Sequence, residues 1–323
     1  SGQSASAKEF VLKGGNSVGE KVWQNVLCQK WVDLINEYSQ GKIKAENYPN
    51  AVLGSDNAMI EKTMFGSIQW SYASTSNLSR LLPEMNTYEL PYIADDSQAN
   101  LKLFYTKDGK LGGPITERLQ QALAKKNLRL CWVSSTFYRA IYNSKHEVRL
   151  PKDCNDLKLR VTASEPERLS VSSWGAAAVP MGYGEVYTAL QQGTIDGLGV
   201  NMPEGIPMKF YEVCPYASYS KFNAYSAVVV MNLDTWNRLP DDLKAIIDKA
   251  SEDTIKFDTE NRKALYDDPY EKELLDRGMK IYKPTPEEES VWKKQTVEKV
   301  WPELIGKTVE QEWVDLWKKQ LNS

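Results

Sequence analysis

The feature that most constrains the fold is a regular alternation of strand-like and helix-like segments along the first quarter of the chain. Residues 19–40 carry apolar side chains at helical spacing, and Gly41 follows where a helix stop is expected. The pattern predicts strands at 9–13, 43–48 and 67–73 and helices at 19–40 and 56–65. Because such alternation favours parallel or mixed sheets, we predict an α/β fold that binds ligands at the carboxyl ends of its strands.

A second series of the same kind begins near residue 128. It predicts strands at 129–133, 157–161 and 224–232 and helices at 165–174 and 185–192. The segment 240–278 is largely helical, and Pro269 should kink or divide it because proline lacks a backbone N–H. Amphipathic helices are predicted in the C-terminal tail, with packing contacts from Trp292, Trp301, Trp313 and Trp317. The 323 residues suffice for two domains or one large α/β unit.

Composition excludes several classes of partner. The chain is 41% hydrophobic and 26% charged, as in ordinary globular proteins, and its net charge is -3. The charges are mixed along the chain, so no basic stripe indicates binding to nucleic acid or to an anionic membrane surface. No apolar run approaches the roughly 18–20 residues that span a bilayer. The opening S-G-Q-S-A-S-A resembles a processed end, so we expect that any export signal has been removed.

The cysteine and histidine content gives no metal motif. The four cysteines lie far apart, and His146 is the one histidine. Structural zinc needs clustered ligands, so we predict neither a metal site nor a cofactor. The sequence leaves two states open for the thiols, namely disulfides in an exported protein or free buried thiols, for Cys28, Cys131, Cys154 and Cys214.

The sequence also lacks the common catalytic motifs. We find no phosphate-binding loop, no dinucleotide fingerprint, no H-E-x-x-H and no G-x-S-x-G. A catalytic triad would need His146, which lies between Lys145 and Glu147 in a charged turn and reads as a solvated surface residue. We therefore predict a binding protein rather than an enzyme. The alternative is a hydrolase or transferase that acts on a small organic acid.

One charged residue interrupts an apolar strand. In K-L-R-V, residues 158–161, Arg160 lies between Leu159 and Val161. A buried, unpaired charge costs several kcal/mol, so the side chain must reach solvent, pair with an internal carboxylate or meet an anionic ligand. From the strand alone, all three remain open.

The segment 156–203 carries a more specific signal. It reads D-L-K-L-R-V, then W-G-A-A-A-V-P-M, then E-V-Y-T-A-L-Q-Q-G-T-I-D-G, with N-M-P shortly after. With G-K-I-K-A-E-N-Y-P-N-A-V-L-G-S-D, E-L-P-Y and T-W-N-R-L-P elsewhere, this resembles the substrate-binding proteins of tripartite ATP-independent periplasmic (TRAP) transporters. The similarity covers most of the chain in family order.

The resemblance implies a periplasmic-binding-protein-like fold with mixed sheets, a cleft between two domains and a long helix that spans both. The domains would be discontinuous, with residues 1–136 and 227–268 in one and 137–226 and 269–323 in the other. The domains would close over a bound organic anion by a hinge motion, and the closed form would dock on a membrane permease. A monomeric, exported periplasmic protein is expected.

The resemblance also implies ligand-binding residues. Arg160 matches the arginine that forms a salt bridge with the ligand's carboxylate, and Arg139 matches a second arginine beside the ligand. Asn201 is displaced by one residue from a family asparagine, and Val200 occupies that position in a gapless alignment. Tyr183 matches an aromatic residue that lines the cleft, and Phe222 falls where some members carry histidine.

Further candidates follow from their place at strand ends. The strand at 67–73 delivers Trp70, Tyr72 and Ser74 to the cleft edge, and Asn16 follows the first strand. Aromatic residues at such positions are as often core residues as cleft residues. The expected ligand is a carboxylate or sulfonate. Its body is either aromatic or apolar, or it is a small acid with the aromatic side chains filling the remaining space.

Overall fold

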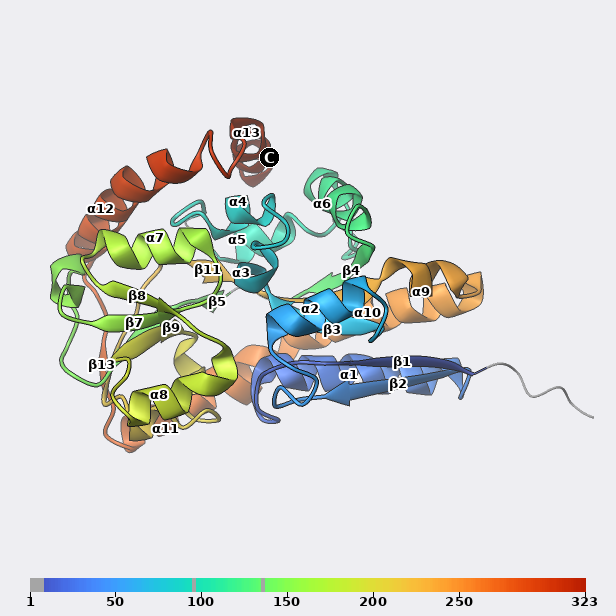
Figure 1. The fold of residues 1–323 in the computed structure, drawn as a ribbon, viewed down its shortest axis with the longest axis horizontal. Coiled ribbons are helices and arrows are strands. Elements are labelled where there is room, and N and C mark those ends of the chain that lie inside the picture. The colour runs from blue at the N-terminus through green and yellow to red at the C-terminus, as the bar shows by residue number, and fades with distance from the viewer. Residues whose placement is uncertain (1–8, 95–96, 135–136) are drawn as a thin grey trace, which may run out of the picture.

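The computed structural model describes residues 9–94, 97–134 and 137–323. Within these ranges the chain forms two lobes, each built on one large β-sheet with helices packed against it (Figure 1). The first sheet has the strand order β2-β1-β3-β12-β4, and the second has the order β13-β10-β6-β9-β7-β8. Both sheets contain parallel and antiparallel neighbours, so the predicted mixed α/β fold is confirmed.

The centre of the first sheet, at β3 and β12, is buried on both faces. Its strands are β1 (Phe10–Gly15), β2 (Ile43–Tyr48), β3 (Trp70–Ser74), β4 (Leu128–Val133) and β12 (Ala227–Asn232). The helices of this lobe are α1 (Trp23–Ser39), α2 (Asp56–Met64), α3 (Thr75–Leu78), α4 (Met85–Glu89), α5 (Ser97–Lys102), α6 (Pro114–Ala124), α9 (Leu233–Arg238) and α10 (Asp241–Arg262). Along β12, Val229 and Met231 join the core under α1 and α10, whereas Val228 and Val230 join the core on the opposite face. Side chains alternate along a strand, so this apolar run suits a strand covered on both faces.

In the second lobe, the same alternation of side chains along a strand determines which face of the sheet Arg160 projects from. Its strands are β6 (Ala140–Asn143), β7 (Lys158–Val161), β8 (Ala177–Pro180), β9 (Gly197–Val200), β10 (Tyr216–Ser218) and β13 (Lys280–Tyr282). Its helices are α7 (Glu165–Ser173), α8 (Val186–Gln191) and the 3₁₀ turns η1 (Pro151–Cys154), η2 (Tyr183–Glu185), η3 (Met202–Gly205) and η4 (Phe210–Glu212). Leu159 and Val161 point into the core shared with Val171 of α7. Arg160 therefore projects from the other face of the sheet.

Three links join the lobes upstream of the C-terminal helices. Two are the strands β5 (Phe137–Tyr138) and β11 (Ala224–Tyr225), which pair with each other in antiparallel fashion. The third is a helical stretch of α10, the π-helical turn η5 (Lys263–Asp267) and α11 (Asp268–Asp276). The π turn immediately precedes Pro269, which has no N–H to donate to the preceding turn. The predicted long helix across both lobes is confirmed, with an irregularity at the predicted place.

The C-terminal helices return from the second lobe to the first. Helix α12 (Pro286–Leu304) packs against α7, where Trp174 donates a 3.0 Å hydrogen bond to Thr296. Helix α13 (Gln311–Leu321) buries Trp313 and Trp317 in the core of the first lobe with Tyr88 and Phe104. The domain boundaries remain a proposal. Because α13 packs on the first lobe, we propose to move it there from the second domain.

Several predicted bounds differ from the structure; the strand predicted at 67–73, for example, begins only at Trp70. The helix predicted at 19–40 begins only at Trp23, after a turn in which Val22 N–H bonds to the carbonyl of Gly19. The strand predicted at 224–232 is divided into β11 and β12 at Ser226. There the backbone of Ser226 bonds to Thr75, whose N–H and hydroxyl it engages at 3.0 and 3.1 Å. These local bonds replace the ladder bonds that periodicity alone predicts.

The four cysteines are all buried and free. Burial raises the pKa of each thiol, that of Cys131 to about 11. Of the two states that the sequence left open, the structure has free buried thiols.

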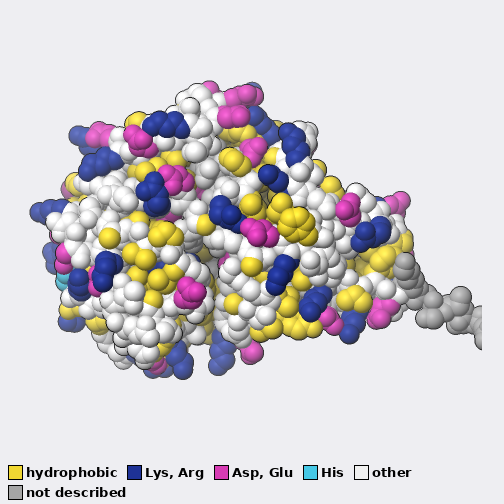
Figure 2. All heavy atoms as spheres, viewed as in Figure 1, with side chains coloured by type: hydrophobic (Ala, Val, Ile, Leu, Met, Phe, Trp, Pro, Cys, Tyr) yellow, Lys and Arg dark blue, Asp and Glu magenta, His cyan; other side chains and the backbone are white. Residues whose placement is uncertain are grey.

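The described residues contain no helix with both the length and the apolar character needed to cross a bilayer. Within the same ranges, no cluster of three or more His, Cys, Asp or Glu side chains is arranged to hold a metal ion. On the face shown in Figure 2, basic and acidic side chains are interspersed, and a furrow runs between the lobes.

A glycine in β1 is required by close packing, which gives a test of the first sheet. A Cβ on Gly14 would lie 2.2 Å from the carbonyl oxygen of Trp70 and 2.3 Å from its ring. We expect Gly14→Ala to lower the free energy of unfolding by about 1–3 kcal/mol, measured by urea denaturation. Gly182→Ala is the control, since no atom lies within 4 Å of its added Cβ. Equal stability of the two variants would contradict the strand packing.

Candidate ligand-binding site

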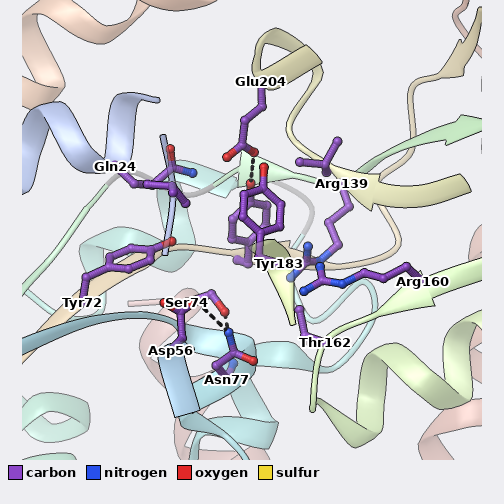
Figure 3. Close-up of a pocket in the computed structure, with 13 residues that line it drawn as sticks. Gln24, Asp56, Tyr72, Ser74, Asn77, Arg139, Arg160, Thr162, Tyr183 and Glu204 are labelled. Carbon is purple, nitrogen blue, oxygen red and sulfur yellow. Dashed lines mark hydrogen bonds between the residues drawn. The ribbon is translucent and has the colours of Figure 1, made fainter. Parts of the chain in front are cut away.

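A pocket lies between the lobes and takes side chains from both (Figure 3). Its inner chamber contains about 350 Å³ of space outside protein atoms. The first lobe contributes Val18, Gln24, Asp56, Tyr72, Ser74 and Asn77 to the chamber. The second lobe contributes Arg139, Arg160, Thr162, Tyr183, Val200 and Glu204, and the linking strand β11 contributes Tyr225. An outer chamber of about 740 Å³ shares Asp56, Asn77, Arg160 and Tyr183 with it.

Arg160 is a buried cation in this pocket, with 4% of its surface exposed. Its Nε donates a 3.1 Å hydrogen bond to the carbonyl oxygen of Met181, and its guanidinium lies 5.5 Å from the ring centre of Tyr183. Among the described residues, no carboxylate forms an ion pair with it, and its two Nη groups have no hydrogen-bond partner. Burial lowers the pKa of Arg160, which remains charged at any physiological pH. The guanidinium therefore has donors available for an anion.

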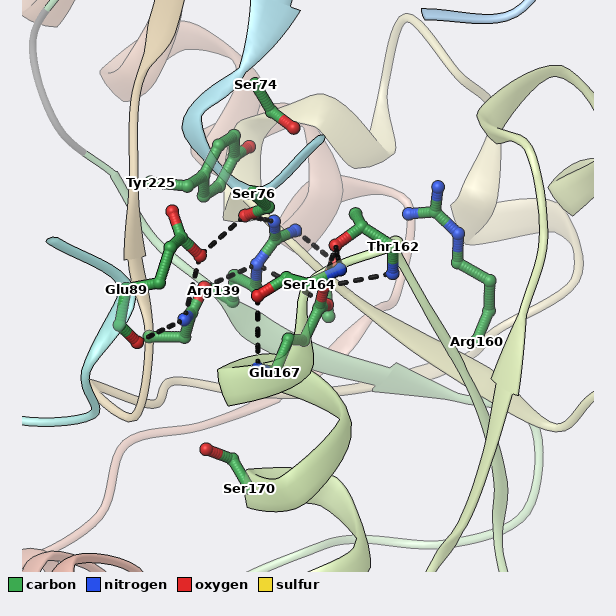
Figure 4. A network of polar contacts seen from close by, with 12 residues as sticks. Ser74, Ser76, Glu89, Arg139, Arg160, Thr162, Ser164, Glu167, Ser170 and Tyr225 are labelled. Carbon is green, nitrogen blue, oxygen red and sulfur yellow. Dashed lines mark hydrogen bonds and ion pairs between the residues drawn. The ribbon is translucent and has the colours of Figure 1, made fainter. Parts of the chain in front are cut away.

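Arg139 lies in the same chamber but is held in a polar network (Figure 4). Its guanidinium donates at 2.8–3.1 Å to the side-chain oxygens of Asn223 and Ser76 and to the carbonyl oxygen of Gly199. Its Nε lies 3.5 Å from the Glu167 carboxylate, and its guanidinium lies 4.2 Å from the ring centre of Tyr225. Arg139 is thus a buried residue that forms an ion pair with Glu167, and it does not lie on the surface.

Two carboxyl groups also line the inner chamber. Glu204, on η3, accepts a 3.3 Å hydrogen bond from the hydroxyl of Tyr225, and Asp56, at the start of α2, accepts one of 3.2 Å from Asn77. Burial raises the pKa of Glu204 to about 7 and that of Asp56 to about 6. In Figure 3 they lie on either side of the region that the arginine side chains of the second lobe face.

Several predicted site residues meet in the chamber. Arg160, Arg139, Tyr183, Tyr72 and Ser74 all line it. Ser74 also caps helix α3 by accepting a 3.1 Å hydrogen bond from the N–H of Asn77. That these five side chains contact a ligand stays a prediction.

Two predicted aromatic residues lie in the core instead. Trp70 is fully buried, donates to the carbonyl of Leu12 at 3.2 Å and packs edge-on against Trp31 at 5.3 Å. Phe222 is 1% exposed and packs edge-on against Trp174 at 4.6 Å. Each ring fills a hydrophobic cluster outside the chamber lining, and contact of either ring with a ligand stays a prediction.

Two predicted asparagines are displaced from the chamber lining. Asn16 is fully buried and fixes the loop after β1 by donating to Asn25 and Asn47 at 2.8 and 3.1 Å. Val200 lines the chamber, whereas Asn201, the next residue, does not. The Asn201 amide nitrogen is buried and has no hydrogen-bond partner among the described residues.

Sequence reasoning missed several chamber residues, above all Gln24, Asp56 and Glu204. Asp56 closes the G-K-I-K…G-S-D segment, and Glu204 directly follows N-M-P, so two of the three adjoin motifs that carried the resemblance. Gln24 lies on an amphipathic helix, where nothing in the pattern distinguishes it from a solvated residue. It is 1% exposed and lines the pocket between the lobes.

The comparison with known families agrees with this geometry. Residues 16–307 match the model of the DctP family, described as bacterial extracellular solute-binding protein, family 7. The chain belongs to this family. The resemblance to TRAP substrate-binding proteins is thereby confirmed.

Relatives and solved structures extend the match over most of this DctP-family chain. A solute-binding protein of Chromohalobacter salexigens is 31% identical over 76% of this chain and 71% of its own length. The sialic acid-binding periplasmic protein SiaP of Vibrio cholerae is 32% identical over 68% and 66%. The sugar acid binding protein of Advenella mimigardefordensis, solved with galactonate, has a TM-score of 0.87 at 24% identity and covers 98% of this chain and 99% of that one.

Family membership also bears on the two buried carboxyl groups. Raised pKa values in a cleft are common in acid–base catalysts. The matched family and the similar proteins are solute-binding proteins, so this DctP-family member is not an enzyme. The raised pKa values of Asp56 and Glu204 follow first from burial.

The different environments of the two arginines predict different effects on stability. We expect Arg139→Met to lower the free energy of unfolding by about 3–5 kcal/mol, because Glu167 would remain buried without its cation. Arg160→Met should be no less stable than the parent protein, since it removes an unpaired buried charge. Guanidinium chloride denaturation without added ligand measures both. Equal destabilisation would show that Arg160 also belongs to the structural network.

The raised pKa of Glu204 predicts that the free energy of unfolding depends on pH. Its pKa in the folded protein, about 7, lies above the ordinary value of 4.5, so folding favours its protonated form. The stability contributed by this proton is present below pH 4.5 and is lost as the pH rises through 7. We expect Glu204→Gln to flatten the decline of the unfolding free energy over this window.

The matched control for this test is Glu303→Gln, whose side chain is 57% exposed and pairs with Lys307. This variant should keep the slope of the parent protein. If both variants keep that slope, Glu204 is ionised in the folded protein at all these pH values, against our expectation.

Proposed function

We propose that this protein is an exported, non-catalytic solute-binding protein that captures an organic acid anion between its lobes and delivers it to a TRAP membrane permease. The observation that carries the proposal is Arg160, a buried guanidinium whose Nη groups have no partner among the described residues. A carboxylate or sulfonate would accept two parallel hydrogen bonds from this planar fork. A bound acid would thus supply the countercharge that the protein lacks there.

The relatives support an acid as the ligand. SiaP of Vibrio cholerae is named for sialic acid, and a 30% identical Escherichia coli protein is named for 2,3-diketo-L-gulonate. A TRAP periplasmic solute binding protein of Chromohalobacter salexigens, 25% identical with a TM-score of 0.82, was solved with D-glucuronate. Each of these ligands bears a carboxylate. We extend that shared group, and not any one ligand, to this chain.

The links between the lobes support capture by closure. The paired strands β5 and β11 and the helix α10–η5–α11 are the segments that would bend when the lobes move together. Closure removes water from the pocket, and the interaction between Arg160 and an acid group strengthens as water leaves. The protein would act in the periplasm as a monomer.

A ligand screen with arginine variants tests the proposal. We expect at least one acid among aromatic, keto, sugar and hydroxy carboxylates and sulfonates to raise the melting temperature in a saturable way. Arg160→Ala should abolish this shift. Arg160→Lys should weaken binding at least tenfold in titration calorimetry, because an ammonium cannot form the planar pair of hydrogen bonds.

The control variant is Arg168→Ala, whose side chain is exposed on α7 and pairs with Glu165. It should bind like the parent protein. Unchanged binding in Arg160→Ala would remove Arg160 as the anchor.

A further inference from the structure

The polar groups of the inner chamber are unevenly distributed. Arg160 is a donor with unused N–H groups, whereas the donors of Arg139 are engaged with Asn223, Ser76 and Gly199. The chamber also holds acceptors, namely the carboxyl groups of Asp56 and Glu204, on either side of the region that the arginines face, and the amide oxygen of Gln24 (Figure 3). Counted over its described residues, the chamber thus offers one unpaired cation and several buried acceptors to whatever enters it.

Gln24 provides a buried acceptor that has no donor. Its side chain is 1% exposed, and its Oε1 has no hydrogen-bond partner among the described residues. A buried acceptor without a donor costs about 1–3 kcal/mol, so the chamber is more stable with a donor placed there. Asn77 donates to Asp56, and Tyr225 donates to Glu204, with the hydroxyl groups of Ser17 and Tyr183 also close to these two carboxyl groups. A carboxyl group has capacity for further donors.

We propose, on the basis of the proposed function, that the pocket selects acids with a single anionic group and a hydrogen-bond-donating body, bearing hydroxyl or ammonium groups. Arg160 holds the acid group, and Asp56, Glu204 and Gln24 accept hydrogen bonds from the body. Asp56 and Glu204 also exclude a second carboxylate, because like charges repel strongly in a water-poor chamber. The family includes proteins named for C4-dicarboxylates, so this restriction distinguishes among its ligand classes.

Within the described residues, the cations named as acting on the two carboxyl groups are the two arginines that already line the chamber. Glu204 is near the hydroxyl groups of Tyr225, Tyr183 and Tyr266, and the nearby charges are those of Arg139 and Arg160. Asp56 is near Ser17, Asn77 and Arg160, with Cys28 and Tyr72 also close enough to interact. Arg139 already has Glu167 as its counterion. A dianion would therefore place its second charge against acids with no cation left to pair it.

The test is titration calorimetry at pH 8 with acids matched in carbon number. One set is threonate, tartrate and butyrate; a second is gluconate, glucarate and hexanoate; a third is 4-aminobutyrate, succinate and butyrate. In each set the first acid has one carboxylate and a donor-bearing body, the second has two carboxylates, and the third has one carboxylate and an apolar body. We expect the first acid of at least one set to bind at least tenfold more tightly than both of its partners.

Two variants then assign the selectivity. Glu204→Gln and Asp56→Asn remove a negative charge with little change of shape, so each should reduce the preference for monoanion over dianion at least tenfold. Because two variants are used, a folding defect in one leaves the other as the test. An unchanged preference in a folded variant would exclude that residue as the discriminating group.

The outcomes separate the two proposals. If a dicarboxylate or an unsubstituted fatty acid binds best, and Arg160→Ala abolishes its binding, the proposed function stands and the selectivity proposal is wrong. If no acid of the panel shows binding that depends on Arg160, the proposed function fails, and the selectivity proposal fails with it.

Discussion

Two buried guanidinium groups line one pocket, and only one of them has a carboxylate partner. Glu167 lies 3.5 Å from Arg139, whereas no described carboxylate pairs with Arg160. Of the described carboxylates, Glu167 alone forms an ion pair with either guanidinium, although Asp56 and Glu204 share the chamber. Arg139 and Glu167 therefore form a fixed wall, and Arg160 remains the group that an incoming anion completes. The polar residues across the chamber have their role only in relation to this missing charge.

Much of the fold could be predicted because each strand carries its own periodic signal. The strand at 43–48 was predicted to the residue, and Pro269 marked the irregular turn of the crossing helix. Arg160 could be found because both the alternation along β7 and the family motif single it out. Such signals are local, and they can be recognised in the sequence without knowledge of tertiary packing.

The remainder of the site depends on packing that no local pattern records. Trp70 and Tyr72 lie on the same face of β3, two residues apart, yet one ring lies under α1 and the other lines the chamber. Their difference is only the distance to the end of the strand where the second lobe approaches. Gln24 became a chamber residue in the same way, because a surface position on one lobe is an interior position between two.

The π turn in the crossing helix changes the angular phase of its side chains. Each residue of an α-helix turns about 100° around the axis, so one additional residue in a turn rotates every later side chain by that angle. Ile247 and Ala250 before the turn join the core of the first lobe, and Leu274 after it joins the core of the second. A single helix can thus present apolar stripes in two directions. Removing one residue from Lys263–Asp267 would turn the second stripe away from its lobe while hardly shortening the helix.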